Sequence, residues 1–173
     1  RTDFDLSAHE KFSGRKLQYF DPERNENYVP YVVETSIGLD RMFLALFSNC
    51  LKDEVLEDGS ERTVLSLPPA LAPVKAAILP LVKKDGLPEF AEKIFNDLKY
   101  DFNVISEEKD SIGKRYRRQD AIGTPFCITV DHDSLTDGTV TLRERDTMKQ
   151  ERVKVEDLRR IIDEKVNFRT LLS

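Results

Sequence analysis

The stretch Pro125-Phe126-Cys127-Ile128-Thr129-Val130 decides the fold of this chain. It is apolar on both of the faces that an extended chain would present. Strands of this kind lie in the middle of a sheet that helices cover on both sides. The polar residues 131–138 that follow predict a turn at its end. This stretch therefore predicts the central strand of a sheet.

Segments with strand and helix patterns alternate around this central strand. We predict further strands at 74–79, 102–105, 139–145 and 151–155, and helices at 88–98, 110–122 and 156–166. The alternation favours parallel strands with helices on both faces, and the last two strands add an antiparallel hairpin at one side. In the strand 139–145 we expect Val140 and Leu142 to point inward and Arg143 and Arg145 to point outward. The predicted fold class is α/β, with a mixed five-stranded sheet.

The first 51 residues predict a smaller piece of structure. Arg1–Leu6 predicts the end of a strand, because acidic and apolar residues alternate there. Two extended runs, Leu17–Phe20 and Tyr28–Glu34, predict a hairpin around a polar turn. Leu39–Leu51 has apolar residues at helical spacing. These residues are too few to bury a full core, so we expect them to be the last part of a larger domain.

A change in composition marks the predicted domain boundary. Lys52–Arg62 is acidic and contains Gly59 and Ser60, which predicts a linker or an exposed insertion. The pair Pro68-Pro69 then ends any regular element. We therefore predict two domains, residues 1–62 including the linker and residues 63–173.

The overall composition narrows the class of protein. Of 173 residues, 39% are hydrophobic and 34% are charged, which predicts a soluble globular chain, and no apolar run approaches the ~20 residues of a membrane span. The net charge of −5 argues against indiscriminate nucleic-acid binding but allows a local basic surface. The cysteines (Cys50 and Cys127) and histidines (His9 and His132) lack the spacing of a metal site, so we expect no metal and a cytoplasmic protein with reduced thiols. The start at Arg1, without Met, indicates a fragment or a processed product.

A second stretch, residues 31–41, carries the candidate chemistry of the N-terminal part. Glu34 and Ser36 are two residues apart and would share one face of a strand. Gly38 allows a turn or a close approach to a ligand. Arg41 falls in the first turn of the next helix, where its charge adds to the positive end of the helix dipole and suits phosphate. The spacing fits a small-ligand site beside an anion, but spacing alone favours a strand, a turn and an ordinary surface arginine.

A third feature is a basic helix in an acidic protein. Its cations are Lys114, Arg115, Arg117 and Arg118. They form either a solvated face or a set of phosphate contacts to RNA, for which Tyr116 or Phe126 could stack a base. Both rings also fit apolar stripes, which favours a place in the core. Arg143 and Arg145 could read base edges or phosphates, and Asp120 and Asp146 could accept hydrogen bonds from bases or pair with neighbouring arginines.

The sequence of residues 30–41 resembles a known motif. Pro30-Tyr31-Val32-Val33-Glu34-Thr35-Ser36-Ile37-Gly38-Leu39-Asp40-Arg41 is similar to the third signature motif of class II aminoacyl-tRNA synthetases, in the form found in the dimeric glycyl-tRNA synthetases. Thr35 stands where that form has proline, and Ile37 stands where it has a small residue. The glutamate, serine, glycine, aspartate and arginine of the motif are present. Residues 1–14 resemble the stretch that precedes the motif in the same family.

The C-terminal half resembles the anticodon-binding domain shared by the glycyl, prolyl, threonyl and histidyl synthetases. The resemblance is carried by Ser111–Tyr116, Gln119–Phe126 and Val140–Met148. The glycyl form fits best, because the threonyl and histidyl enzymes have a different third motif. Residues 1–62 would then be the end of a class II catalytic domain, and residues 63–173 the anticodon-binding domain.

The resemblance implies a function for the longer parent protein. A glycyl-tRNA synthetase activates glycine with ATP and Mg²⁺ and passes the glycyl group to tRNA. By the family pattern, Glu34 holds the α-ammonium of glycine, Ser36 completes the pocket, and Arg41 clamps the ATP phosphates as the catalytic residue. The tRNA contacts would come from Lys114, Arg115, Arg118, Arg143 and Arg145. The parent would be a homodimer with no membrane attachment. The chain alone would be inactive, because the first and second signature motifs are missing.

Two alternatives stay open at the level of sequence. One is a non-catalytic relative that binds nucleic acid, of the type of the accessory subunit of mitochondrial DNA polymerase. The presence of Glu34, Ser36 and Arg41 argues against it. The other is a sister synthetase, with proline as its substrate.

Overall fold

A computed structural model describes residues 2–172, and the side chains of residues 170 and 171 are left out of the description. The chain divides into two compact units, Arg1–Met42 and Phe43–Ser173. Within the described part of the chain, no helix is long and apolar enough to cross a membrane.

The first unit contains one helix and one small hairpin. Helix α1 spans Phe4–Ser13 and ends at Gly14, which adopts the left-handed conformation at φ 67°. Strands β1 (Tyr19–Asp21) and β2 (Glu26–Tyr28) pair antiparallel. The predicted hairpin is therefore confirmed, although β2 ends at Tyr28. The prediction of a strand at the N-terminus was wrong, because a short alternation does not outweigh a helical segment that glycine can cap.

The first unit has no core of its own. None of residues 2–42 is buried. Residues 31–38 have no regular secondary structure, which contradicts the predicted strand through Glu34. A strand needs a neighbour for its backbone N–H and C=O groups. The pairing of β1 with β2 stops at the Tyr19–Tyr28 pair, and beyond it the N–H of Val32 donates to the carbonyl of Thr2 at 3.0 Å instead of joining a strand ladder.

Helix α2, Leu39–Cys50, confirms the predicted helix and leads directly into a second hairpin. Strands β3 (Leu51–Val55) and β4 (Glu61–Leu65) pair antiparallel in full register. The predicted linker is therefore ordered structure. Composition did not reveal this, because the buried Arg62 of the hairpin has its partner Asp120 58 residues away in sequence.

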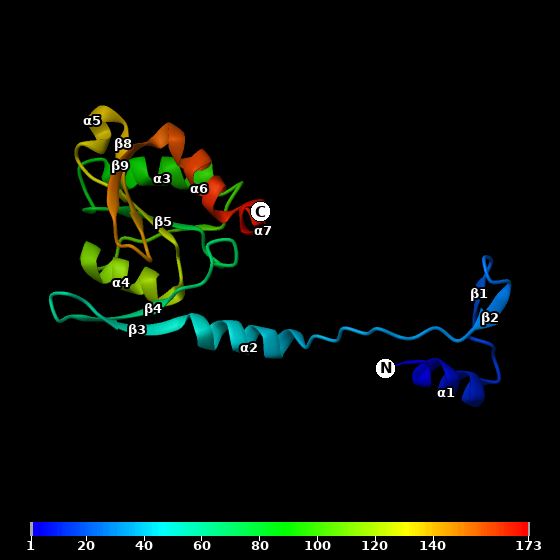
Figure 1. Ribbon diagram of the computed structural model, residues 1–173. Coiled ribbons are helices and arrows are strands. Elements are labelled where there is room, and N and C mark those ends of the chain that lie inside the picture. Colours follow the sequence, from blue (N-terminus) through cyan, green and yellow to red (C-terminus); the bar gives the residue numbers. More distant parts are fainter. Residues whose placement is uncertain (1, 173) are drawn as a thin grey trace. The chain divides into compact units, whose positions relative to one another are not determined.

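The main sheet of the second unit has five strands in the order β6-β5-β7-β8-β9 (Figure 1). Their bounds are β5 Ala76–Pro80, β6 Val104–Ser106, β7 Phe126–Val130, β8 Thr139–Glu144 and β9 Gln150–Lys154. Strand β5 is parallel to β6 and β7, whereas β8 is antiparallel to β7 and β9. The mixed five-stranded sheet and its central strand are thus as predicted.

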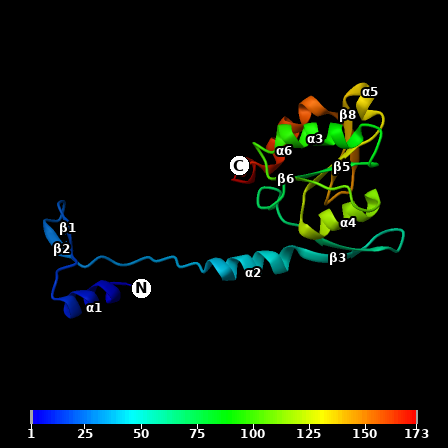
Figure 2. The ribbon, with the colours of Figure 1, turned by 180° about the vertical axis from the view of Figure 1, so that it is seen from behind.

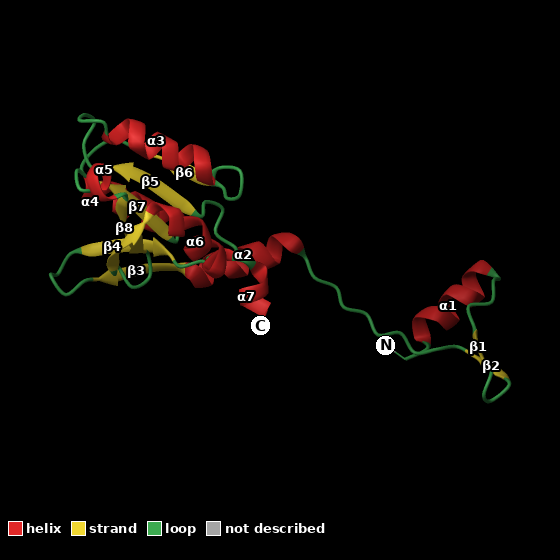
Figure 3. Ribbon diagram, turned by 90° about the horizontal axis from the view of Figure 1, so that it is seen from above, coloured by secondary structure: helices red, strands yellow, loops and turns green. Residues whose placement is uncertain are grey.

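Helices cover both faces of this sheet. Figures 1 and 2 show α3 (Leu87–Leu98) and α6 (Leu158–Val166) on one face and α4 (Ile112–Ile122) on the other. The larger core lies under α3 and α6, where Leu87, Ile94 and Ile162 pack on Ile78 and Ile128. The smaller core lies under α4, and β4 of the hairpin packs against this helix (Figure 1). Figure 3 shows the two strands of this hairpin from above. The short helices are α5 (Ser134–Asp137), the 3-10 turn Val155–Asp157 and α7 (Phe168–Leu172).

Candidate functional site

The residues of the 31–41 stretch lie on exposed chain. Glu34 and Ser36 are both exposed and do not share a strand face, because the segment is irregular. Arg41 lies in the first turn of α2, as predicted, and is exposed. The backbone N–H of Met42 donates to the carbonyl of Gly38 at 3.0 Å and closes this turn. The guanidinium of Arg41 therefore stands at the positive end of a helix, in a position that suits an anion.

The helix that carries Arg41 also presents apolar side chains to solvent. Leu39, Phe43 and Leu44 are 83%, 65% and 64% exposed. Phe43 and Phe47 stack on each other, with ring centroids 5.9 Å apart. Apolar surface of this extent on one helix is typical of a face that packs against another part of a protein.

The basic helix α4 does not present all of its cations to solvent. Arg115 is buried, and its guanidinium donates to the carbonyls of Pro80 at 2.7 Å, Glu107 at 3.0 Å and Leu81 at 3.2 Å. Burial lowers the pKa of Arg115. Arg115 donates to backbone carbonyls at the ends of β5 and β6. Its guanidinium is therefore not available to RNA, contrary to the predicted contact.

Lys114 and Arg118 remain on the surface of α4, and Arg118 is already paired. Its guanidinium bonds the carboxylates of Glu107 at 2.5 Å and Asp110 at 2.8 Å, and it donates to the carbonyl of Lys109. The hydrogen bond from Arg118 holds the pKa of Asp110 below its usual value. The positive charge at this end of the helix is therefore partly neutralised, whereas Lys114 is exposed.

The prediction that Arg143 points outward was wrong. Its side chain is 5% exposed and forms a two-pronged pair with Asp120, with N–O distances of 2.7 and 2.9 Å. Burial alone lowers the pKa of Arg143, but the hydrogen bonds to Asp120 outweigh it and hold the pKa above its usual value. Strand alternation places Arg143 on the face opposite Leu142, and that face is covered here by α4. RNA could reach this guanidinium only if it left Asp120.

Arg145 is also buried, contrary to the same prediction. Its guanidinium donates to the carbonyls of Gly123 at 2.8 Å and Leu67 at 2.7 Å. Its Nε and Nη2 bond both oxygens of Asp146, at 2.8 and 2.7 Å. The sequence left open whether Asp146 accepts from a base or from an arginine, and the structure gives it an arginine. Arg145 thus ties three chain segments together.

An aromatic ring lies over the buried pair. The guanidinium carbon of Arg143 is 4.8 Å from the ring centroid of Tyr116, and the Tyr116 hydroxyl lies 2.6 Å from Oγ1 of Thr129. Burial raises the pKa of Tyr116. Phe126 is 3% exposed in the larger core. Both rings therefore belong to the packed interior, which is the alternative that their apolar stripes favoured.

Beside Tyr116 the sheet presents polar groups that sequence analysis did not single out. The guanidinium of Arg152, on β9, donates to the hydroxyls of Thr139 at 3.0 Å and Thr141 at 3.3 Å, on β8. It also bonds Asp131 at the end of β7. Thr141 lies opposite Thr129 in the β7–β8 register, so this polar group continues the face on which Tyr116 sits. The alternation of threonines in 139–141 with apolar neighbours was the signal that could have identified it.

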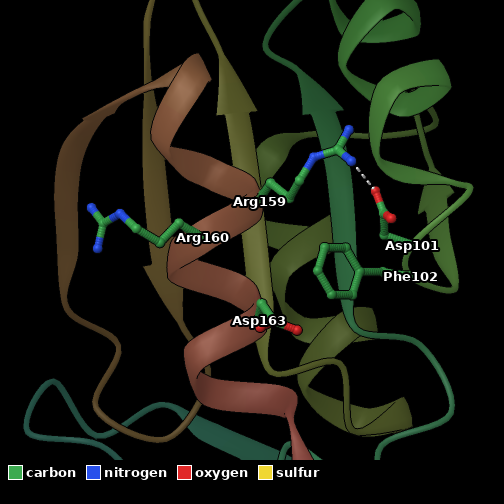
Figure 4. A pocket seen from close by; sticks show the side chains of 5 residues that line it. All are labelled: Asp101, Phe102, Arg159, Arg160 and Asp163. Atoms are coloured by element: carbon green, nitrogen blue, oxygen red, sulfur yellow. Dashed lines mark ion pairs between the residues drawn. The ribbon is translucent and has the colours of Figure 1, made fainter.

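The hollow in Figure 4 lies on the opposite face, between α6 and the segment after α3. It has a volume of about 420 Å³ and is lined by Asp101, Phe102, Arg159, Arg160 and Asp163. Arg159 pairs with Asp101 at 2.5 Å and with Asp97 at 3.0 Å, and Arg160 points to the other side of α6. The guanidinium nearest the hollow is thus neutralised by carboxylates of this chain, so it does not attract an anion.

The polar face beside α4 lies in a part of the chain whose sequence matches a known protein family. Residues 75–165 match the family model described as "Anticodon binding domain". The chain belongs to this family. The matched residues include all five strands of the main sheet and all of α6 except Val166.

Two relatives extend the similarity beyond the anticodon-binding domain. The glycine–tRNA ligase of Clostridium perfringens is 55% identical over 172 residues, which cover 97% of this chain and 36% of the relative. That of Chlorobaculum tepidum is 56% identical over 155 residues, which cover 90% of this chain and 33% of the relative. The chain therefore spans about a third of the length of the relatives it matches.

One solved structure shares the fold of the second unit. It is the RNA binding domain of threonyl-tRNA synthetase from Cryptosporidium parvum, with a TM-score of 0.53 and 24% sequence identity. The match covers 58% of this chain and 25% of that one. At this identity the similarity shows the architecture alone. It confirms the mixed sheet with helices on both faces.

Proposed function

We propose that this chain is the C-terminal part of a glycine–tRNA ligase, which uses ATP to attach glycine to tRNA. The observation that supports this most strongly is the similarity to ligases of that name along almost the whole chain, including the exposed segment before α2. That segment carries a glutamate, a serine and an arginine, which are the kinds of group that bind an ammonium group and phosphates.

Within this proposal, residues 31–41 belong to the site for ATP and glycine. Arg41 would bind the ATP phosphates from the first turn of α2, where charge and helix dipole act together. Glu34 would pair with the ammonium group of glycine, and Ser36 would complete the pocket. The Mg²⁺ that accompanies ATP would neutralise phosphate charge. Activation of a carboxylate by ATP depends on positioning and charge neutralisation, and these residues supply both kinds of group.

We further propose that the anticodon region of tRNA binds the polar face beside α4. Exposed hydroxyl and guanidinium groups at Thr139, Thr141 and Arg152 suit the edges of unpaired bases. Lys114 and Arg118 would add phosphate contacts from the surface of α4. The predicted contacts of Arg115, Arg143 and Arg145 are not part of this proposal, because their side chains are buried and bonded within the domain.

The partners and location follow from the same proposal. The longer protein would be a homodimer in the cytoplasm, and the exposed apolar face of α2 would pack within its catalytic domain. The two alternatives receive less support. A prolyl enzyme or a polymerase accessory subunit would not be expected to share more than half of its residues with glycine–tRNA ligases over 97% of this chain.

The test is amino-acid-dependent exchange of pyrophosphate into ATP, measured with the full-length protein that carries this chain. Exchange with glycine and not with proline is the expected result. Exchange with proline would establish the sister synthetase, and no exchange with any amino acid would establish the non-catalytic alternative. Charging of glycine tRNA by the same preparation tests the second step.

A further inference from the structure

Asp120, on α4, is a single buried carboxylate shared by two arginines from different elements. It is 0% exposed. Its Oδ1 and Oδ2 bond Arg143 of β8, and Oδ2 also accepts from Nη1 of Arg62, on β4, at 3.1 Å. The side chain of Arg62 is itself 2% exposed. A buried carboxylate with two arginine partners holds together the elements that carry them, because separation of the hairpin from α4 would take one of the two counter-charges away from Asp120.

Arg62 has further hydrogen-bond partners, in β3 and just after β8. Its Nε and Nη2 bond Oε2 of Glu54, across the hairpin on β3, at 2.8 and 2.7 Å. Its Nη1 also donates to the backbone carbonyl of Arg145 at 2.9 Å. All three nitrogens of this guanidinium therefore have acceptors, and they come from the hairpin, from α4 and from the end of β8. The fork geometry is one that lysine does not reproduce.

The hairpin that Arg62 holds is continuous with the helix that bears Arg41. Helix α2 ends at Cys50 and β3 begins at Leu51. The N–H of Ser66, just after β4, donates to the carbonyl of Cys50 at 2.7 Å and closes the base of the hairpin on the helix end. Whatever orients the hairpin on the anticodon-binding domain therefore also orients the end of α2.

We propose that Arg62 is a positioning residue that, through Asp120, locks the hairpin β3–β4 and the end of α2 onto the anticodon-binding domain. The consequence for activity rests on the function proposed above. Transfer of glycine to tRNA needs the anticodon-binding domain to hold the tRNA, so we expect charging to depend on how firmly this domain is joined to the hairpin and the end of α2. Adenylate formation needs no tRNA and does not depend on this junction.

The two ends of the lock respond differently to substitution. Arg62→Met leaves Asp120 in its two-pronged pair with Arg143, and Glu54 is exposed enough to be hydrated. Asp120→Asn instead leaves the buried guanidinium of Arg143 without a counter-charge and leaves Arg62 with Glu54 alone, so its effect is larger. Arg62→Lys keeps the positive charge but loses the planar guanidinium that bonds several acceptors at once. Arg160→Met is the matched control, because Arg160 also pairs with two carboxylates, at 3.1 and 3.3 Å, but on the exposed surface of α6.

The first measurement is amide hydrogen exchange of the 173-residue chain. Arg62→Met should speed exchange of the β3–β4 amides about ten-fold or more and leave the β5 and β7 amides unchanged, with a smaller effect for Arg62→Lys. Arg160→Met should change neither set. Equal acceleration throughout the main sheet, or none in the hairpin, would overturn the lock whatever the protein's activity is.

The second measurement uses the full-length protein, with pyrophosphate exchange and tRNA charging compared in each variant. We expect Arg62→Met and Arg62→Lys to retain exchange within about two-fold and to lose about ten-fold or more in kcat/KM for tRNA. Parallel loss of both activities, or loss of neither, would overturn the positioning role. If the wild-type protein shows no exchange with glycine, the proposed function fails, and the positioning role for charging is overturned with it.

Discussion

Gly123 lies directly against Leu65: a Cβ atom on Gly123 would be 3.0 Å from the Leu65 carbonyl oxygen and 3.3 Å from its side chain. Gly123 ends α4 in the left-handed conformation at φ 85°, and Leu65 ends β4. The absence of a side chain at this glycine therefore serves two purposes. It allows the helix to stop, and it lets the hairpin approach the helix end.

This contact predicts that Gly123→Ala destabilises the second unit by about 3 kcal/mol, of which about 1 comes from the left-handed backbone and the rest from the displaced hairpin. Gly59→Ala is the control, since Gly59 has a similar φ of 79° but open space around its Cβ position. We expect a loss of about 1 kcal/mol for that variant. Urea unfolding of both variants measures the difference. Equal losses in the free energy of unfolding would show that Leu65 moves away from the new methyl group without destabilising the unit.

Acid should weaken the bond between Asp146 and Arg145. Burial by itself raises the pKa of Asp146, but the hydrogen bonds and charge of Arg145 outweigh it and hold the pKa below the ordinary 3.8. A carboxyl group whose pKa is lower in the folded state adds stability above its unfolded pKa and loses it as the pH falls through the folded pKa. Asp146→Asn should therefore lower the free energy of unfolding at pH 7, and this loss should shrink as the pH falls through the folded pKa of Asp146. Urea unfolding of the parent and the variant across the acid range tests this, and a loss that does not change with pH would mean that the charge of Asp146 is irrelevant.

Proteolysis distinguishes the two positions of the domain boundary. The predicted boundary near residue 62 would expose Glu57 and Glu61 to a glutamate-specific protease, whereas the compact units meet after Met42. We expect first cleavage within residues 2–42, at Glu34 among others, because nothing there is buried. A stable product that begins near residue 62, with no earlier product from residue 35, would favour the boundary predicted from sequence.

The order of helices and strands was predictable because apolar periodicity follows directly from which face each element buries. Strand β7 and helix α3 follow this rule, and Gly123 marks the end of α4 as expected. The failures concern charged groups. Arg62, Arg143 and Arg145 look like surface residues in sequence, because buried arginine is rare without partners. Their partners lie 58, 23 and 78 residues away, at Asp120, Asp120 and Leu67, which local patterns do not reveal.

The same distinction between buried and exposed arginines gives the prediction for RNA binding. Arg152→Gln should weaken binding of glycine tRNA by about 1–3 kcal/mol and reduce discrimination against an anticodon-swapped tRNA, because its guanidinium lies on the exposed polar sheet face. Lys114→Gln should weaken both RNAs equally and reduce the slope of log K against log salt by about 0.7–0.9. Arg118→Gln should reduce it less, because Glu107 and Asp110 already neutralise this cation. Binding is measured at two salt concentrations, with Arg160→Gln on the other face as the control. If Arg152→Gln binds both RNAs as the parent does, the anticodon contacts lie elsewhere on the domain.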